Sequence, residues 1–207
     1  MNPRLILASA SPRRVDLLLQ LNLSFEQVVS PVDEPVNDLV PEAFANEAAR
    51  IKAEAVYGLV RDRPDPHLVI GADTVVSIEG RVLGKPRDGE DATCMLQMLS
   101  GREHEVFTGL VVRGPTDGDE RSACERTRVW MTSFSQASIA GYVESGEPLD
   151  KAGSYGIQGE GARFVERIEG DYYNVVGLPL ARLCSLLEEA GYDLDRVAAR
   201  TPDSCQP

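Results

Sequence analysis

An α/β fold with a mixed central sheet is the architecture that the sequence predicts. Short apolar runs at residues 5–8 and 68–72 are typical of buried strands, and segments with apolar residues at helical spacing alternate with such runs. Turn-forming residues at 79–80 and 115–120 each lie between two strand-like runs, which indicates hairpins and therefore antiparallel pairs in the sheet. We expect one domain over residues 1–195, followed by a disordered tail over residues 196–207.

The first of these runs leads into a strand, turn and helix. The apolar segment 5–8 is followed by Ser9-Ala10-Ser11-Pro12-Arg13-Arg14 and then by the helical pattern of residues 15–21. Ser11 suits the N-cap, and Pro12 suits the first helical position. A helix N-terminus carries free N–H groups and partial positive charge, to which Arg13 and Arg14 can add forked hydrogen bonds. The segment therefore predicts an anion site, and a capped helix with two solvated arginines is the alternative.

Helices and strands continue to alternate along the rest of the chain. The predicted helices cover residues 41–60 and 88–99, a short segment capped by Ser135, and residues 180–189. The predicted strands cover residues 68–78, 81–83, 106–113 and 124–134, whereas the glycine-rich stretch 148–170 is expected to be mostly loop. Lys52 lies at the edge of the apolar stripe of the first of these helices, where a snorkelling surface lysine is the common alternative to a functional one.

Asp73 is the candidate for acid–base chemistry. It follows the apolar run 68–72, and ligands of open α/β sheets bind outside the carboxyl ends of such strands. A carboxylate there can hold a divalent metal or polarise a water molecule. Gly71 permits a close backbone approach, and Thr74 adds a hydroxyl group. An aspartate that caps a turn is the alternative.

Three further positions carry polar chemistry on loops. Lys85 lies between Gly84 and Pro86, and Glu34 belongs to an acidic pair that we interpret as a solvated loop. Gln158 lies in a stretch with several glycines, where its amide can both donate to and accept from a base edge, although a flexible glycine-rich loop is the alternative. His67 and His104 show no triad partner and are interpreted as structural or exposed.

Composition restricts the classes of function. The formal net charge is −12, which disfavours nucleic acid as a partner, so an anionic ligand needs a local basic pocket or a metal. The four cysteines are widely spaced, which argues against a zinc site and favours a reducing, cytoplasmic setting. No run of about 20 apolar residues predicts a membrane span.

Segments spread over the chain from residue 4 to about residue 190 resemble the Maf family of nucleoside triphosphate pyrophosphatases. In order, they are Ser9-Ala10-Ser11-Pro12-Arg13-Arg14, Ile70-Gly71-Ala72-Asp73-Thr74-Val75-Val76, Gly84-Lys85-Pro86, Leu99-Ser100-Gly101 with His104, Thr108-Gly109, Gly146-Glu147-Pro148, Asp150-Lys151-Ala152-Gly153, Ile157-Gln158-Gly159, Gly170-Asp171-Tyr172 and Asn174-Val175-Val176-Gly177-Leu178-Pro179. One such motif alone is weak, but the ordered set is specific.

The resemblance implies an elongated fold with two lobes, similar to that of inosine triphosphatases, and a cleft between them. It also implies a homodimer and hydrolysis of a nucleoside triphosphate to the monophosphate and pyrophosphate with Mg²⁺ or Mn²⁺. Asp73 matches the proton acceptor and is a candidate metal ligand together with Glu34. The positions that distinguish the branch acting on dTTP and UTP are matched by Arg13, Thr74 and Gln158, and other pocket positions by Ser9, Arg14, Lys52 and Lys85.

This resemblance leaves alternatives for the function. The expected role is house-cleaning of the nucleotide pool, including modified pyrimidine triphosphates. A sister branch acts on 7-methyl-GTP, and other purine triphosphates are a further possibility. A protein of a different class, a regulatory binding protein in septum formation or cell division arrest, is the other candidate.

Overall fold

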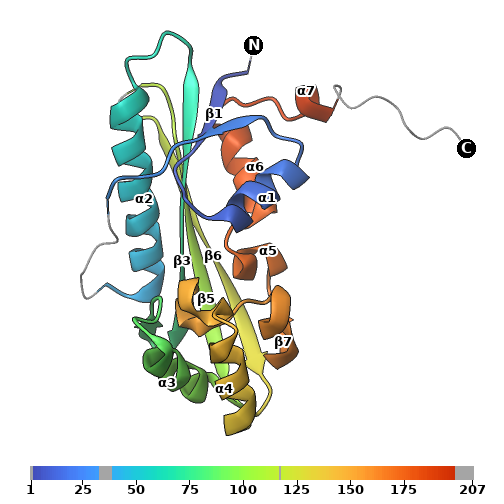
Figure 1. Cartoon of the computed structure of the whole chain (residues 1–207). Helices are drawn as coiled ribbons and strands as arrows, with labels where there is room; N and C mark the ends of the chain where they lie inside the picture. Colours follow the sequence, from blue (N-terminus) through green and yellow to red (C-terminus); the bar gives the residue numbers. More distant parts are fainter. Residues whose placement is uncertain (1, 33–38, 117, 199–207) are drawn as a thin grey trace, which may run out of the picture.

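A mixed sheet runs along the length of an elongated molecule (Figure 1). The computed structural model describes residues 2–32, 39–116 and 118–198. The sheet has seven strands in the order β2-β1-β3-β5-β6-β7, with β4 paired to β3. Its strands are β1 (Arg4–Leu7), β2 (Phe25–Gln27), β3 (His67–Ile78), β4 (Arg81–Leu83), β5 (Glu103–Arg113), β6 (Glu120–Met131) and β7 (Val165–Glu169). The predicted fold class is confirmed, because β1 is parallel to both β2 and β3 while the other pairs are antiparallel.

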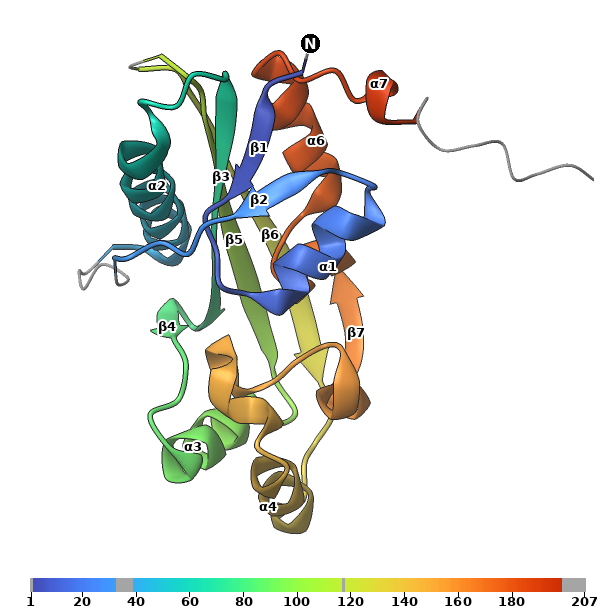
Figure 2. The same cartoon turned by 45° about the horizontal axis from the view of Figure 1, so that its top comes forward.

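Helices cover both faces and one end of this sheet (Figures 1 and 2). They are α1 (Pro12–Gln20), α2 (Pro41–Val60), α3 (Gly89–Leu99), α4 (Gln136–Glu144), α5 (Tyr172–Val176), α6 (Leu180–Glu189) and α7 (Asp195–Ala198), with the 3-10 helices η1 (Glu147–Asp150), η2 (Ala152–Ser154) and η3 (Gly159–Phe164). The long helix α2 lies on one face, α1 and α6 lie on the other, and α3 and α4 lie at one end.

Alternation along β3 divides its side chains between these two faces. Leu68, Ile70 and Ala72 pack in the cluster that includes residues of α1 and α6, whereas Val69 packs against α2. Gly71 faces α2 as well, and a Cβ atom there would lie 2.3 Å from the carbonyl oxygen of Ala49. The helix therefore approaches the strand closely because position 71 has no side chain.

Two separate parts of the core correspond to the expected two lobes. One cluster joins β1, β3, α1 and α6, and it includes Leu18 and Leu183. Another cluster at the opposite end joins α3 and α4 to the nearby parts of β3, β5 and β6, and it includes Leu96 and Tyr142. The long strands β3 and β5 pass from one part to the other, so one sheet connects the two lobes.

Most predicted elements are present, and local signals account for their ends. Ser135 caps α4 by accepting a hydrogen bond from the N–H of Ser138 at 3.1 Å. Glu79 and Gly80 both have positive φ at the predicted hairpin turn between β3 and β4. Ser11 lies at the N-cap of α1 as expected, but its side chain makes no capping hydrogen bond.

The structure corrects three predictions and adds two elements. Asp73, expected at the carboxyl end of the apolar run 68–72, lies in the middle of one continuous strand, β3. The stretch 148–170 is not mostly loop, because it contains η1 to η3 and β7. The short elements β2 and α5 carry too few residues to show a hydrophobic period, and they were not predicted. Residues 196–198 belong to the helix α7, so the tail predicted over 196–207 begins with ordered chain, and its remainder lies outside the described residues.

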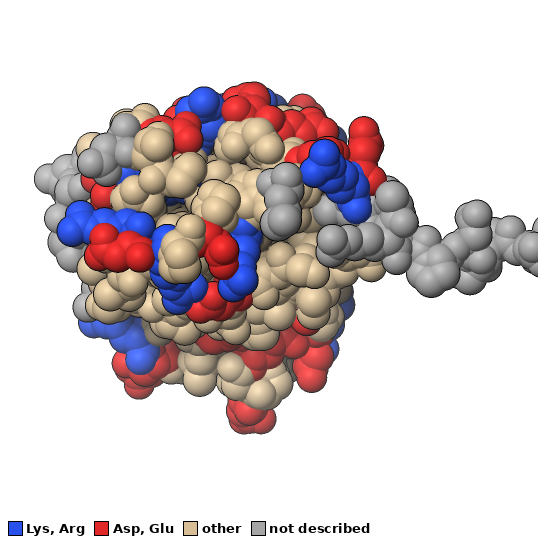
Figure 3. All heavy atoms as spheres, turned by 90° about the horizontal axis from the view of Figure 1, so that it is seen from above, with Lys and Arg blue, Asp and Glu red and all other residues tan. Residues whose placement is uncertain are grey.

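Three further observations complete the description of the fold. From above, acidic and basic side chains are interleaved on the face that Figure 3 shows. Within residues 2–32, 39–116 and 118–198, no helix has both the length and the apolar content needed to cross a membrane. Cys94, Cys124 and Cys184 carry free thiols.

Candidate functional site

The site lies where the strand pairing along one edge of β3 is interrupted. On one side of this strand, β1 pairs with residues 67–70 and β4 pairs with residues 76–78. Between these two partners, residues 71–75 have no strand neighbour on that side among the described residues. Asp73 and Thr74 lie in this interval, and as consecutive strand residues they point to opposite faces of the sheet. A ligand that enters at the interruption can therefore reach both side chains.

Asp73 meets Lys52 on the α2 side of this opening. Lys52 donates a hydrogen bond from its Nζ to Oδ1 of Asp73, and the two side chains are 16% and 4% exposed. The alternative interpretation of Lys52 as a snorkelling surface residue is therefore wrong. The close approach of α2 to Gly71 and Gly109 brings the ammonium group to the carboxylate, since a Cβ at either glycine would lie 2.3 Å from a backbone oxygen of α2.

Arg14 organises the other face of the opening. Its guanidinium is buried and donates to the carbonyl of Gly177 at 2.8 Å, to Oγ of Ser9 at 3.1 Å and to Oγ1 of Thr74 at 3.1 Å. The Ser9 hydroxyl in turn accepts from the N–H of Ser11 at 3.2 Å. One arginine thus connects the turn after β1 with β3 and with the residue that follows α5.

Thr74 is held in place by a series of hydrogen-bonded polar side chains in the core. Its hydroxyl lies 2.9 Å from that of Thr108, which donates to the carbonyl of Asn174 at 3.1 Å. The side-chain amide of Asn174 donates to Thr127 Oγ1 at 2.9 Å and to the carbonyl of Val106 at 3.0 Å. Because a buried hydrogen-bonded chain leaves few alternative rotamers, the Thr74 hydroxyl has a defined position in the cleft.

These residues line a cleft of about 360 Å³ between the two lobes. One wall comes from residues 8–14, and the opposite wall from Gly84, Lys85 and residues 150–158. Five basic side chains line it, against two described carboxylates; the basic ones are Arg13, Arg14, Lys52, Lys85 and Lys151, and the carboxylates are Asp73 and Asp150. In a protein with a net charge of −12, this is the local basic pocket that an anionic ligand requires.

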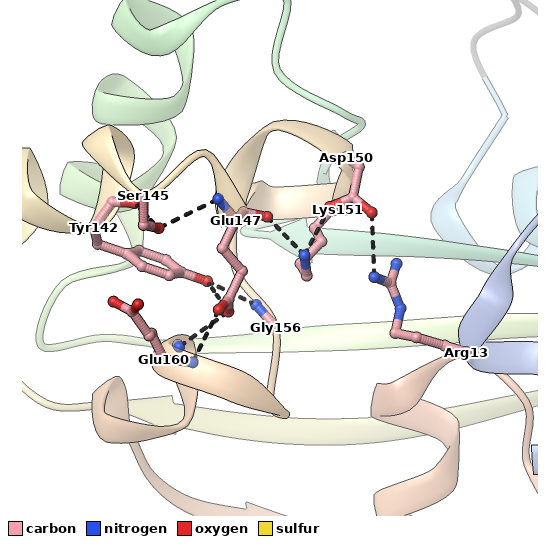
Figure 4. A network of polar contacts seen from close by, with 9 residues as sticks. Arg13, Tyr142, Ser145, Glu147, Asp150, Lys151, Gly156 and Glu160 are labelled. Atoms are coloured by element: carbon pink, nitrogen blue, oxygen red, sulfur yellow. Dashed lines mark hydrogen bonds and ion pairs between the residues drawn. The ribbon is translucent and has the colours of Figure 1, made fainter. Parts of the chain in front are cut away.

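One ionic contact joins the walls of the cleft, and a second holds its carboxylate from the same wall. Arg13 Nη1 lies 3.4 Å from Oδ2 of Asp150, and Lys151 Nζ lies 2.7 Å from Oδ1 of the same carboxylate (Figure 4). Burial raises the pKa of Asp150, but the hydrogen bond from Lys151 and the charges of Lys151 and Arg13 outweigh it, so the pKa is lowered overall. Asp150 therefore carries negative charge at neutral pH.

Tyr155 also lines the cleft, and its hydroxyl contacts a buried histidine. The Tyr155 hydroxyl lies 2.8 Å from Nε2 of His104, and both residues are buried. Burial lowers the pKa of His104 to about 4 and raises the pKa of Tyr155. Both groups are neutral at physiological pH, which supports the interpretation of His104 as a structural residue.

Comparison with known proteins identifies the chain. The family described as Maf-like protein matches residues 4–190. The chain belongs to the Maf family. A protein of Carboxydothermus hydrogenoformans named dTTP/UTP pyrophosphatase is 49% identical over 189 residues, which cover 91% of this chain and 100% of the relative. A protein of Pelotomaculum thermopropionicum with the same name is 48% identical over 191 residues, which cover 92% and 98%.

A solved structure aligns with part of this Maf protein. It is the nucleoside-triphosphatase, or dITP/XTP pyrophosphatase, of Mycobacterium abscessus, with 17% sequence identity and a TM-score of 0.40. The alignment covers 63% of this chain and 75% of the other.

The Maf cleft brings together the candidate residues that the structure describes. Those at its lining are Ser9, Arg13, Arg14, Lys52, Asp73, Thr74, Lys85 and Gln158. Asp73 reaches it from the middle of β3 and not from the end of a strand, because the neighbouring strand β1 is the one that ends there. The remaining candidate, Glu34, lies outside the described residues.

Other members of the site were not singled out from the sequence. Asp150, Lys151 and Tyr155 line the cleft, while Thr108 and Asn174 support Thr74 from within the core. Most of these lie in segments that carried the family resemblance, which was the available signal. Except for Lys151, their roles depend on contacts between residues more than 30 positions apart, which no local pattern contains.

Proposed function

We propose that this Maf protein is a nucleoside triphosphate pyrophosphatase that hydrolyses dTTP and UTP to the monophosphate and pyrophosphate. The observation that carries the proposal is the position of Asp73 at the opening beside β3, in a cleft lined by basic side chains from both lobes. A triphosphate is a multiply charged anion of the kind that this lining accommodates. Membership of the Maf family, with relatives named dTTP/UTP pyrophosphatase, supports the same substrate class.

The proposed reaction is a displacement at the α-phosphorus. The oxygen of a water molecule forms a bond to this phosphorus, and the bond between the α-phosphorus and the bridging oxygen breaks, so that pyrophosphate leaves with the electron pair. Asp73 accepts the proton that the water loses. Arg13, Lys52 and Lys85 stabilise the charge that develops on the triphosphate, because they present fixed positive groups along the cleft.

A divalent cation, Mg²⁺ or Mn²⁺, is part of the proposal. Within the described part of the chain, no group of three or more His, Cys, Asp or Glu side chains could hold a metal ion. Asp73 nevertheless fits the usual arrangement for Mg²⁺, in which one or two carboxylates act together with substrate phosphates. Asp73 would hold the cation, with Glu34 as the second candidate ligand. The cation would neutralise charge on the phosphate oxygens.

Base selection is assigned to Arg13, Thr74 and Gln158. The Thr74 hydroxyl is fixed by its buried partners, and Gln158 is exposed at the wall formed by the second lobe. The side chain of Gln158 makes no hydrogen bond to another described residue, so its amide is available to donate to and accept from a pyrimidine edge. A site of this kind rejects an unmatched base because its polar groups are left unpaired.

The test is pyrophosphate release by the purified protein with Mg²⁺. We expect kcat/KM for dTTP and UTP to exceed that for CTP, GTP and ATP by at least about tenfold, the scale of one or more lost base hydrogen bonds. Fastest turnover of 7-methyl-GTP would place the protein in the sister branch. No pyrophosphate from any triphosphate would favour the regulatory binding protein.

Location and assembly belong to the same proposal. A cytoplasmic location is part of the proposal because the widely spaced cysteines favour a reducing compartment, and a homodimer is what the family resemblance implies. Size-exclusion chromatography with light scattering measures the molar mass in solution. A homodimer should have twice the 22.5 kDa of one chain.

A further inference from the structure

The segment that carries Gln158 is tied to the protein at both of its ends by two residues outside the cleft lining (Figure 4). At the first end, the N–H of Gly156 donates to the hydroxyl of Tyr142 at 3.2 Å. At the second end, the N–H of Glu160 donates to Oε2 of Glu147 at 2.9 Å, and the N–H of Gly161 donates to Oε1 at 3.1 Å. Gln158 lies between these attachments.

Glu147 is the centre of this network. Besides the two N–H groups, its Oε1 accepts from the Tyr142 hydroxyl at 2.8 Å, so that both ends of the segment depend on one carboxylate. Burial raises the pKa of Glu147, but the hydrogen bonds from Glu160, Tyr142 and Gly161 outweigh it and lower the pKa overall. The carboxylate is therefore charged at neutral pH and acts as an acceptor only.

Close packing leaves this segment little room to take another path. A Cβ atom at Gly161 would lie 2.4 Å from the carbonyl oxygen of Gly156 and 2.5 Å from the Tyr142 hydroxyl. Gly159 has a φ of +71°, and a Cβ atom there would lie 2.7 Å from Oε2 of Glu147. The turn closes tightly on the carboxylate because these positions have no side chains.

The backbone of Glu147 extends the network to the opposite wall. Its carbonyl accepts from Nζ of Lys151 at 2.6 Å, and Lys151 also pairs with Asp150, which contacts Arg13 (Figure 4). Arg13 and Gln158 are two of the three residues assigned to base selection. One short segment, residues 147–151, thus connects them across the cleft.

We propose that Glu147 is a positioning residue that holds Gln158 in the orientation that reads the base. The inference rests on the proposed function, because it explains how the proposed enzyme selects among bases. Without the carboxylate, the 156–161 segment retains its sequence but loses the acceptor that fixes both of its ends. Asp73 and Lys52 lie on β3 and α2, outside the network, so the proposal assigns to Glu147 a role in selection and not in the displacement itself.

The experiment compares UTP with CTP, which differ only at the edge of the pyrimidine ring. In the Glu147→Gln variant, an amide nitrogen replaces one carboxylate oxygen and cannot accept from an N–H group. We expect the ratio of kcat/KM for UTP over CTP to fall about tenfold, the scale of lost hydrogen bonds to a charged group. We expect this fall to appear mainly in KM for UTP, with kcat within about twofold, because interactions lost equally from ground and transition states change KM alone.

Two further variants isolate the mechanism. If Glu147 acts through Gln158, then Glu147→Gln leaves the ratio unchanged in a Gln158→Ala background, because residues that act as one unit are not additive. Glu144→Gln is the matched control: it removes the same charge from an exposed position on α4, and the ratio is expected to stay at the wild-type value.

Hydrogen exchange supplies a readout that needs no substrate. The amides of Glu160 and Gly161 should exchange faster in Glu147→Gln than in the wild type, while amides of β3 and β5 keep their protection. If Glu147→Gln does not fold, Tyr142→Phe takes its place, since it removes one hydroxyl and leaves the buried ring. A UTP to CTP ratio that stays at the wild-type value in this variant then overturns the inference.

The outcomes separate the two proposals. A selective wild-type protein whose selectivity survives Glu147→Gln, or falls further when Glu147→Gln is added to Gln158→Ala, overturns the positioning role alone. A wild-type protein that hydrolyses UTP and CTP alike overturns the base preference proposed above, and the positioning role with it.

Discussion

Lys52 and Asp73 form an ion pair in the cleft, and they come from two elements that pack against each other. The lysine belongs to α2 and the aspartate to β3, and their side chains are 16% and 4% exposed. The positive group offsets the charge of a carboxylate that is almost completely buried. This contact exists because Gly71 and Gly109 let the helix approach the sheet, which links the packing of the core to the chemistry of the site.

Removal of the lysine should destabilise the protein. We expect Lys52→Met to lower the free energy of unfolding by about 3 kcal/mol, because it leaves a buried carboxylate without its paired ammonium group. The double variant Lys52→Met/Asp73→Asn should recover part of that loss, since the uncompensated charge is also gone. Urea unfolding of the two variants measures this, and a double variant less stable than Lys52→Met would contradict the pairing.

Removal of the carboxylate charge should abolish most of the turnover. For Asp73→Asn we expect kcat to fall by at least about 100-fold, the usual contribution of a positioned base, while KM changes by less than about threefold. Steady-state pyrophosphate release measures both quantities. Glu166→Gln, at an exposed position of β7 away from the cleft, is the control for a loss of one charge. Near wild-type kcat in Asp73→Asn would show that another group accepts the proton.

A single methyl group should separate α2 from β3. In Gly71→Ala the new Cβ would lie 2.3 Å from the carbonyl oxygen of Ala49, so the helix must shift. We expect a loss of about 1–3 kcal/mol in the free energy of unfolding. We also expect lower kcat, because Lys52 moves with the helix.

The matched control for this prediction lies on α2 itself. A Cβ at Gly58 has no neighbour within 4 Å, and Gly58→Ala should stabilise the protein by about 0.5–1 kcal/mol, as alanine does in a helix interior. Thermal or urea unfolding measures both variants. The packing argument fails if Gly71→Ala is as stable as Gly58→Ala.

The buried His104 should make stability depend on pH. Burial lowers its pKa from 6.5 to about 4, so the unfolded chain binds a proton that the folded protein does not bind between these values. The stabilising contribution is therefore complete above pH 6.5 and is lost as the pH falls from 6.5 towards 4, by up to about 3 kcal/mol.

Unfolding at a series of pH values checks this expectation. The free energy of unfolding of His104→Gln should change less between pH 7 and pH 5 than that of the wild type. The variant also assigns the histidine signals in an NMR titration, because the chain has 2 histidines. A His104 signal that titrates with its midpoint above pH 6 would rule out the proposed effect of burial.

The contact between Arg13 and Asp150 should compete with substrate. The pair is 3.4 Å apart with side chains 29% and 63% exposed, and a triphosphate would have to take Arg13 from the carboxylate. We expect Asp150→Asn to lower KM for UTP about threefold at low salt, and less in 0.5 M salt, because exposed charges are screened. Glu166→Gln should leave KM unchanged, and a higher KM in Asp150→Asn would mean that the carboxylate holds Arg13 ready for the substrate.

The strength of each local signal decided how much of the fold the sequence predicted. The long helix α2 and the strands β3, β5 and β6 show clear hydrophobic periods, and each was predicted with its approximate ends. The strand β7 was missed because Val165 and Ile168 are only half-buried and polar residues separate them. The turns of 3-10 helix between residues 147 and 164 were missed because contacts around Glu147 and Tyr142 hold them, and no periodic pattern marks them.

For the site, the sequence alone determined which residue types are available and in which order they occur. It placed Ser9, Arg13 and Arg14 at the start of a helix and Asp73 at the end of a buried apolar run, because capping residues and apolar runs act within a few positions of the chain. Only the tertiary structure decided that Lys52 reaches Asp73, that Arg14 joins Ser9 to Thr74, and that Glu147 holds the segment of Gln158. These contacts join residues that are distant in the chain, and they form only when helix, sheet and loop pack against one another.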